Sequence, residues 1–190
     1  MSVAIAGETK PITMQEDDAL VLEACKNPEA FSALYQRYVK RVYHYLYSKV
    51  GQQADAEDLT AQVFLEVIES LPRYRPQGYF AAWIFTIARR RASNLFRQKT
   101  VWLPLDIIEN LPVDGIDLID QFIQKERMEE LANEIQRLKA DEIEILQLHF
   151  TARLTYAEIG KVLGKSETVV RMIVHRILQK LKKAWENDHE

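Results

Sequence analysis

Residues 155–182, TYAEIGKVLGKSETVVRMIVHRILQKLK, decide the fold of the C-terminal part of the chain. Thr155 and Glu158 have the spacing of a capping box, in which the threonine caps a helix start and the glutamate returns the hydrogen bond. Gly164 can end that short helix, and Ser166 can cap the next one. Two helices joined by a glycine turn predict a helix-turn-helix.

The second of these helices has two chemically different faces. Its apolar stripe consists of Val170, Ile173, Val174, Ile177, Leu178 and Leu181. Its opposite face carries Thr168, Arg171, Met172, His175, Gln179 and Lys182. A basic outer face, with the small Gly160 where the helices would cross, is typical of a motif that enters the major groove of DNA. The alternative is an ordinary helical hairpin with solubilising charges, and Lys165 stands where the motif usually has an apolar residue.

Charged residues are segregated along the chain, although its 190 residues have a formal net charge of only −3. Residues 71–100 contain seven basic residues and no acid, and residues 165–185 have a local charge of +5. The charged residues of the segment 51–70 are all acidic: Asp55, Glu57, Asp58, Glu66 and Glu69. Two basic segments indicate two sites for a polyanion, whereas a solvated helix face is the simpler alternative for either segment alone.

Helical periodicity extends through the N-terminal half. Residues 31–46 place apolar side chains at helical spacing, and Gly51 ends that helix. Asp55 can cap a second helix, and a third is expected over about residues 79–96. The apolar side of the second helix is formed by Leu59, Val63, Phe64, Val67, Ile68 and Leu71. Since no segment shows strand alternation, we predict an all-α fold.

The loss of this periodicity divides the chain into two small helical domains. Residues 100–120 are rich in acids and interrupted by prolines, and we expect them to form an acidic linker. Residues 16–99 then form the first domain and residues 121–186 the helix-turn-helix domain, while residues 1–15 are predicted to be a disordered tail.

Several classes of protein are excluded by composition. No apolar run approaches the roughly 18 residues of a membrane span, and the N-terminus lacks the apolar stretch of a secretory signal, so we expect a cytoplasmic protein. Cys25 is the only cysteine, which excludes an internal disulfide and a cysteine-based zinc site. The histidines are scattered, and no phosphate-binding loop or nucleophile motif is found. We therefore expect neither an enzyme nor a cofactor or metal site.

Residues 73–97 interleave aromatic residues with arginines. Aromatic faces stack on unpaired bases and arginines hold phosphates, so this composition suits single-stranded or locally opened nucleic acid. We expect Tyr74 and Tyr79 to be exposed, because one lies in a loop and the other starts a helix. The aromatic residues expected in the core are Phe80, Trp83 and Phe85.

These motifs together resemble bacterial RNA polymerase sigma factors of the extracytoplasmic-function (ECF) group. The resemblance covers residues 16–185. It lies in residues 55–60 (DAEDLT), 63–65 (VFL), 73–76 (RYRP), 80–84 (FAAWI), 87–89 (IAR) and the helix-turn-helix of residues 155–176. It implies a subunit that binds core RNA polymerase and directs promoter recognition and opening.

The resemblance also implies which residues meet each partner. Core polymerase would be contacted by Asp55, Glu57, Asp58, Gln62 and Glu66. The opened −10 element would be contacted by Arg73, Tyr74, Arg75, Tyr79, Arg89, Arg90 and Arg97. The duplex −35 element would be contacted by Ser166, Thr168, Arg171, Met172, His175 and Arg176. Whether an anti-sigma protein also binds is left open.

The chain departs from the family pattern at three places. Residues 61–62 are Ala-Gln where Gln-Glu is common, Arg90 replaces a frequent Asn, and Val169 and Ile173 stand where Thr and Arg are common. The resemblance therefore does not give the promoter sequence. The main alternative is a two-domain helix-turn-helix regulator with a helical sensing domain, but such a domain has no need of an acid-free basic segment with loop tyrosines.

Overall fold

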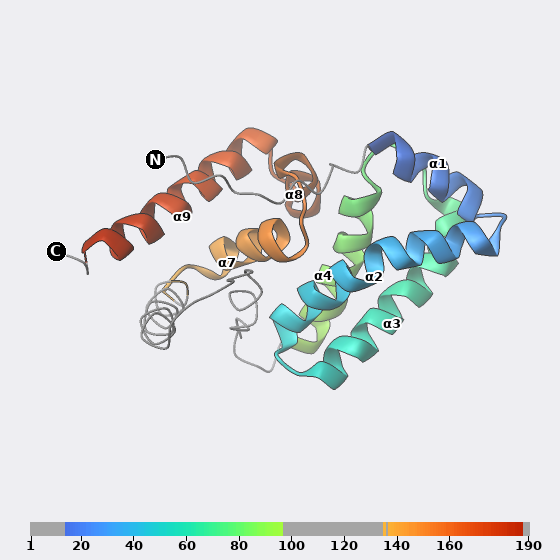
Figure 1. Cartoon of the computed structure of the whole chain (residues 1–190), viewed down its shortest axis with the longest axis horizontal. Coiled ribbons are helices and arrows are strands. Elements are labelled where there is room, and N and C mark those ends of the chain that lie inside the picture. The colour runs from blue at the N-terminus through green and yellow to red at the C-terminus, as the bar shows by residue number, and fades with distance from the viewer. Residues whose placement is uncertain (1–13, 97–134, 136, 188–190) are drawn as a thin grey trace, which may run out of the picture.

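The computed structural model describes residues 14–96, 135 and 137–187, and the regular elements within them are helical (Figure 1). The first group of helices comprises α1 (Met14–Ala24), α2 (Pro28–Val50), α3 (Gln53–Ser70), the 3-10 turn η1 (Leu71–Arg73) and α4 (Phe80–Phe96). The second comprises α7 (Ala140–Leu146), the π-helical turn η2 (Gln147–Thr151), α8 (Tyr156–Leu163) and α9 (Glu167–Asn187). The all-α prediction is confirmed for these residues.

Two predictions about the ends of the first domain fall largely outside this part of the chain. The acidic linker of residues 100–120 lies outside the described residues, and so does the tail up to residue 13, whereas Met14 already begins α1. Within the residues that are described, we find no helix that combines the length and the apolar character needed to cross a membrane.

α2 is the central helix of the first group, and the signals at its two ends explain its length. Asn27 caps its start, with Oδ1 accepting a hydrogen bond from Glu29 N at 2.9 Å. Gly51 ends it in a left-handed conformation (φ 68°), with its N–H donating to Tyr47 O at 2.8 Å, as the sequence predicts. The hydrophobic α2 side chains with 0% exposure are Tyr38, Val42, Tyr45 and Leu46.

α3 is capped three residues earlier than predicted. Its N-cap is Gln52, whose side chain makes no capping bond, and Asp55 lies in the first turn, where its charge favours the helix dipole. Ile68, which the sequence places on the buried side, is 50% exposed. The buried stripe runs through Val63 and Val67, and Ile68 is displaced from Val67 by about 100° around the helix.

The predicted helix-turn-helix is confirmed in its capping details. Thr155 Oγ1 accepts a hydrogen bond from Glu158 N at 3.3 Å, while Thr155 N donates to Glu158 Oε2 at 2.7 Å. Gly164 ends α8 with φ 65°, and Val169 N donates to Ser166 Oγ at 3.3 Å at the start of α9. The short-range sequence signals therefore set both boundaries of the turn.

Gly160 allows the chain after α8 to fold back closely. A Cβ atom at this position would lie 2.6 Å from the carbonyl oxygen of Lys165, which is closer than real Cβ contacts. The backbone of the turn therefore passes where any other side chain would stand. This close approach explains why a glycine stands in α8 at the point where the sequence predicts that the two helices cross.

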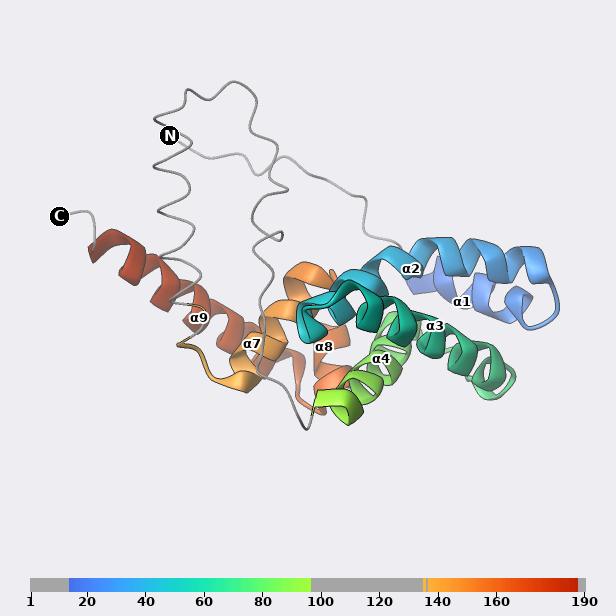
Figure 2. The same cartoon turned by 90° about the horizontal axis from the view of Figure 1, so that it is seen from below.

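The two groups of helices pack against one another, with η2 beside α2 and α8 beside α4 (Figures 1 and 2). Gln147 Nε2 donates to Ser48 O at 2.9 Å in the buried contact. Arg41 Nε donates to Ala152 O at 2.9 Å, and its guanidinium also reaches Arg153 O at 3.2 Å. The sequence predicts two domains but gives no sign of this contact between them.

Glu144 of α7 forms a second junction between the groups. Tyr45 Oη donates to Glu144 Oε1 at 2.7 Å, Lys49 pairs with the other carboxylate oxygen, and Arg89 Nε lies 3.8 Å from Oε1. Burial, followed by the charge of Glu144, raises the pKa of Tyr45 well above its usual value, so the hydroxyl keeps its proton and donates. Burial lowers the pKa of Lys49, although the charge of Glu144 opposes this shift.

Candidate nucleic-acid interface

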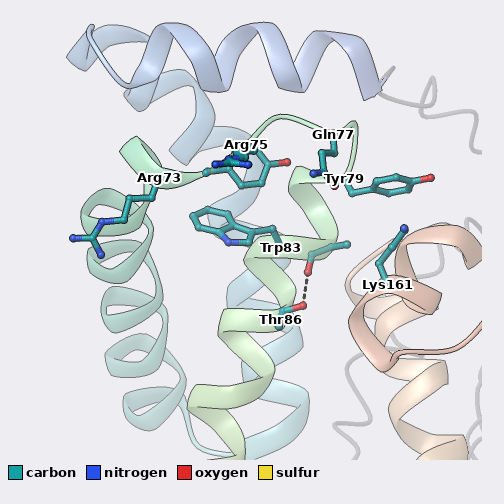
Figure 3. A pocket seen from close by; sticks show the side chains of 9 residues that line it. Arg73, Arg75, Gln77, Tyr79, Trp83, Thr86 and Lys161 are labelled. Carbon is teal, nitrogen blue, oxygen red and sulfur yellow. Dashed lines mark hydrogen bonds between the residues drawn. The ribbon is translucent and has the colours of Figure 1, made fainter.

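An open pocket of about 390 Å³ lies between the loop of residues 73–79 (the 73–79 loop), α4 and α8 (Figure 3). It is lined by Arg73, Tyr74, Arg75, Gln77, Tyr79, Ala82, Trp83, Thr86 and Lys161. The loop, one face of the first turns of α4 and a single side chain from α8 therefore form its walls. Most of these residues belong to the segment in which the sequence interleaves aromatic residues with arginines.

Packed aromatic rings support the pocket from below. The Tyr74 ring centroid lies 4.8 Å from that of Trp83 and 5.5 Å from that of Phe80, and Phe80 is only 1% exposed. The sequence predicts an exposed Tyr74 and a core Trp83, but both are half-buried, because each packs on Phe80 with one side and borders the pocket with the other. Phe80 and Phe85 are buried as predicted.

Tyr79 lies at the rim of the pocket, half-buried. Lys161 Nζ is 4.8 Å from the centroid of its ring, and Figure 3 shows the two side chains facing each other from the end of the 73–79 loop and from α8. This geometry is a cation–π contact. The contact brings one positive charge from the second group of helices to the pocket, and nothing in the sequence near Tyr79 signals a partner so far along the chain.

The arginines predicted to meet the −10 element fall into two sets. Arg73 and Arg75 are exposed beside the pocket, and Arg73 extends away from Trp83 in Figure 3. Arg89 and Arg90 are exposed further along α4, about 15 Å from its start at the usual helical rise. Arg97 lies outside the described residues. The structure therefore gathers the loop residues into one site and separates the α4 arginines from it.

Arg90 and Arg91 of α4 are both engaged by Glu66 of α3. Arg91 Nη2 lies 2.7 Å from Glu66 Oε2, and Arg90 pairs with the other carboxylate oxygen. Burial alone would raise the pKa of Glu66, but the hydrogen bonds and charges of Arg91 and Arg90 outweigh it and hold that pKa below its usual value. The sequence suggests an uncompensated negative charge at Glu66, whereas the structure shows a carboxylate that joins two helices.

The exposed side of α3 carries the other predicted polymerase-binding residues. Glu57, Asp58 and Gln62 are exposed, and Asp55 is half-buried. Two apolar residues share this exposure, and nothing in the sequence signals it. Leu65 is 61% exposed and Ile68 is 50% exposed, so α3 presents a mixed acidic and apolar surface to solvent.

The outer face of α9 is free of core packing, as predicted. Thr168, Met172 and His175 are exposed. Arg171 is exposed and pairs with Glu167 one turn earlier, and such an exposed pair contributes only about 0.2–0.5 kcal/mol. Arg171 Cζ also lies 5.6 Å from the centroid of the Tyr156 ring, and an exposed cation–π contact contributes about 0.5–1 kcal/mol. Both contacts are weak enough for the guanidinium to exchange them for a stronger acceptor.

Two other predicted −35 residues have structural partners. Ser166 caps α9, and Arg176 Nη2 lies 3.4 Å from Glu142 Oε1, with Lys180 Nζ 3.6 Å from the same oxygen. The hydrogen bond from Lys139 N, together with these cations, lowers the pKa of Glu142. Glu142 therefore holds α9 against α7 through Lys180 and through Arg176, which the sequence analysis assigned to the −35 element.

The two helical groups coincide with two known protein domains. The model for Sigma-70 region 2 matches residues 34–101, and the model for Sigma-70, region 4 matches residues 135–183. CarQ of Myxococcus xanthus, an RNA polymerase sigma factor, is 30% identical over 154 residues, which cover 81% of this chain and 88% of CarQ. BldN of Streptomyces coelicolor, an ECF RNA polymerase sigma factor, is 30% identical over 163 residues, or 84% of this chain and 62% of BldN.

Solved structures show the same fold. CnrH, in complex with the cytosolic domain of CnrY, superposes with a TM-score of 0.65 at 21% identity, covering 90% of this chain and 98% of CnrH. The sigma factor RpoE of Bartonella quintana, in complex with the anti-sigma factor NepR, gives a TM-score of 0.56 at 15% identity, covering 82% of this chain and 96% of that one.

These helices, the basic pocket and the helix-turn-helix define a sigma factor with regions 2 and 4, which is a binding subunit and not an enzyme. The chain belongs to the ECF-type RNA polymerase sigma factors. It directs promoter recognition by RNA polymerase, and its two sigma domains bind core polymerase and promoter DNA. α1 precedes the part of the chain that matches region 2.

Glu66→Gln should lower the free energy of unfolding at pH 7 by about 1 kcal/mol, because glutamine loses the charge-assisted bonds to two arginines that are themselves solvent-screened. The lowered pKa of Glu66 means that its stabilisation is fully present above the unfolded-state pKa of about 4.3 and is lost as the pH falls through the folded-state pKa. Urea denaturation at pH 7 and at about pH 3 measures the difference. Glu69→Gln, on the exposed side of α3, is the control, and an equal deficit of the Glu66 variant at both pH values would contradict the assignment.

Proposed function

We propose that the pocket beside the 73–79 loop receives an unpaired base of the −10 element. The outer face of α9 reads the −35 element as duplex, and the exposed side of α3 docks on core polymerase. The observation that carries this proposal is the pocket itself, an open space beside a loop that is lined by aromatic rings, two arginines and one amide.

The pocket has the groups that capture of a single base requires. Tyr79 offers a ring for stacking, and Trp83 forms the apolar floor. Gln77 supplies an amide donor and acceptor for base edges, while Arg73 and Arg75 supply positive charge for the phosphates on either side. Stacking alone contributes about 1–3 kcal/mol per base, enough to favour opening at a weak base step.

The outer face of α9 supplies the duplex reader. Thr168, Arg171, Met172 and His175 lie in the first turns of the helix, where recognition helices meet base edges. Because the Arg171–Glu167 pair is exposed and weak, Arg171 can exchange it for the O6 and N7 atoms of a guanine. Ser166 and Arg176 support this helix through their contacts within the domain.

The exposed side of α3 supplies the polymerase contact. Asp58 and Gln62 give this surface polar groups. Leu65 and Ile68 lie one turn apart and add exposed apolar area, and adjacent exposed apolar side chains are typical of a protein-interaction surface. Glu66 contributes indirectly, because its carboxylate is committed to α4. A protein partner with a basic and apolar groove fits this combination.

Tyr79→Ala should weaken binding of a single-stranded −10 oligonucleotide by roughly tenfold or more, because the stacking ring is removed. Tyr79→Phe keeps the ring and should remain within about twofold of the wild type. Fluorescence anisotropy with the full chain, and transcription by the holoenzyme on a template with unpaired −10 bases, measure both variants. Wild-type binding by a folded Tyr79→Ala variant would contradict the role of the pocket.

Arg171→Ala should relax the preference at one or two −35 positions, at a cost of about 1–3 kcal/mol for the preferred base pair and little for the others. Binding to a library of duplexes with single −35 substitutions measures this change. Lys165→Ala, at the exposed turn before α9, is expected to weaken all sequences equally. If Arg171→Ala behaves like Lys165→Ala, Arg171 contacts phosphate and not a base.

Leu65→Ala and Asp58→Lys should both lower affinity for core polymerase, but with different salt dependence. Removal of the exposed leucine side chain costs about 1–3 kcal/mol of apolar burial at any ionic strength, whereas the charge reversal is most damaging at low salt. Titration of labelled chain with core polymerase at two salt concentrations separates the two terms. Leu22→Ala changes a similarly exposed leucine on α1 and is the control. Unchanged affinity of both α3 variants would place the polymerase contact elsewhere.

A further inference from the structure

α1 is fixed onto the first group of helices by one buried acid. Asp17 is 7% exposed, and its two carboxylate oxygens are held by different α2 residues. Arg37 Nη1 lies 2.5 Å from Oδ1, and the hydroxyl of the fully buried Tyr38 donates to Oδ2. This helix is thus firmly placed although it precedes the part of the chain that matches region 2.

The next residue, Asp18, is directed to the 73–79 loop. Asp18 Oδ2 accepts a hydrogen bond from Gly78 N at 2.7 Å. Neighbouring side chains on a helix point about 100° apart, so the same turn of α1 that grips α2 through Asp17 can hold the loop through Asp18. A charged acceptor on a backbone N–H makes a shorter and stronger bond than a neutral one.

The backbone of the 73–79 loop changes direction at Gly78. Its φ is 74°, a left-handed conformation that favours glycine, and it stands between Gln77 and Tyr79, which both line the pocket. The peptide N–H held by Asp18 therefore determines where the Gln77 amide and the Tyr79 ring lie. Loss of that bond would free the left-handed residue to adopt other conformations.

Asp18 also borders the other side of the loop. Its Oδ1 atom and the Tyr74 hydroxyl are both buried without a well-formed hydrogen bond among the described residues. Burial, followed by the charge of Asp18, raises the pKa of Tyr74 to about 12, so the hydroxyl remains a donor near this carboxylate. The charge of Asp18 therefore acts on the loop at Tyr74 as well as at Gly78, where it accepts the hydrogen bond.

We propose that Asp18 is a positioning residue for promoter recognition: its carboxylate, set in place by α1, fixes the 73–79 loop in the conformation that accepts a −10 base. The inference rests on the proposed role of the pocket. It extends the −10 site to a helix that precedes the part of the chain matched by region 2. Base selection then depends on a residue that does not itself contact the base.

Asp18→Ala should reduce discrimination between −10 bases at least threefold on single-stranded oligonucleotides, while affinity for core polymerase and for −35 duplex stays within about twofold of the wild type. Asp18→Asn keeps an acceptor for Gly78 N and should retain most of the discrimination. Glu23→Ala removes one exposed acid from the same helix and controls for the change in net charge. The proposal is overturned if Asp18→Ala discriminates like the wild type, or if Glu23→Ala or Asp18→Asn loses as much as Asp18→Ala.

Amide hydrogen exchange gives a measurement that needs no DNA, and its first result comes from the wild-type chain alone. In the wild-type chain the Gly78 amide should exchange at least tenfold more slowly than that of the exposed Arg75, and this protection should fall in Asp18→Ala. An unprotected Gly78 amide in the wild type would overturn the proposal. Tyr79→Ala distinguishes failure of the pocket proposal from failure of the Asp18 proposal. If Tyr79→Ala leaves −10 binding intact, the pocket is not the −10 site. If Tyr79→Ala impairs binding and Asp18→Ala does not alter discrimination, only the role of Asp18 is wrong.

Discussion

Two buried tyrosine hydroxyls on α2 hold much of this structure together. Tyr38 and Tyr45 are both 0% exposed, lie two turns apart and each require a hydrogen-bond acceptor, because a buried hydroxyl without one costs about 1–3 kcal/mol. Asp17 of α1 accepts from Tyr38, and Glu144 of α7 accepts from Tyr45. These two hydrogen bonds satisfy the only polar atoms of the tyrosine rings, and they also attach α1 and region 4 to the central helix of region 2.

Charge serves the fold as well as the partners of this sigma factor. Glu66 holds the basic side of α4, and Glu142 holds the basic side of α9, so in each region one carboxylate positions two basic side chains. The segregated charges along the chain therefore do not map simply onto binding surfaces. The part that we assign to DNA is the charge around the 73–79 loop and on the outer face of α9, which neither of these two carboxylates engages.

The sequence is informative where the interaction is local. The capping box at Thr155, the turn at Gly164 and the end of α2 at Gly51 are set by neighbours within a few residues, and each was predictable. Contacts between distant segments were not, because no pattern in the sequence pairs Glu66 with Arg90 or brings Lys161 to Tyr79. The exposure of Ile68 shows a further limit, since periodicity finds the apolar side of a helix but not the width of the surface that buries it.

The buried cluster that contains Tyr38 and Phe85 continues without a break through Leu148 and Ile159 of region 4. A core shared in this way couples the stabilities of the two regions, because neither can lose its packing without exposing apolar surface of the other. In the compact chain they therefore form one cooperative unit. A macromolecule that binds the two regions apart from each other must cover the apolar surface of Leu148 and its neighbours that the separation exposes. Its net binding free energy is therefore reduced by the free energy needed to separate the two regions.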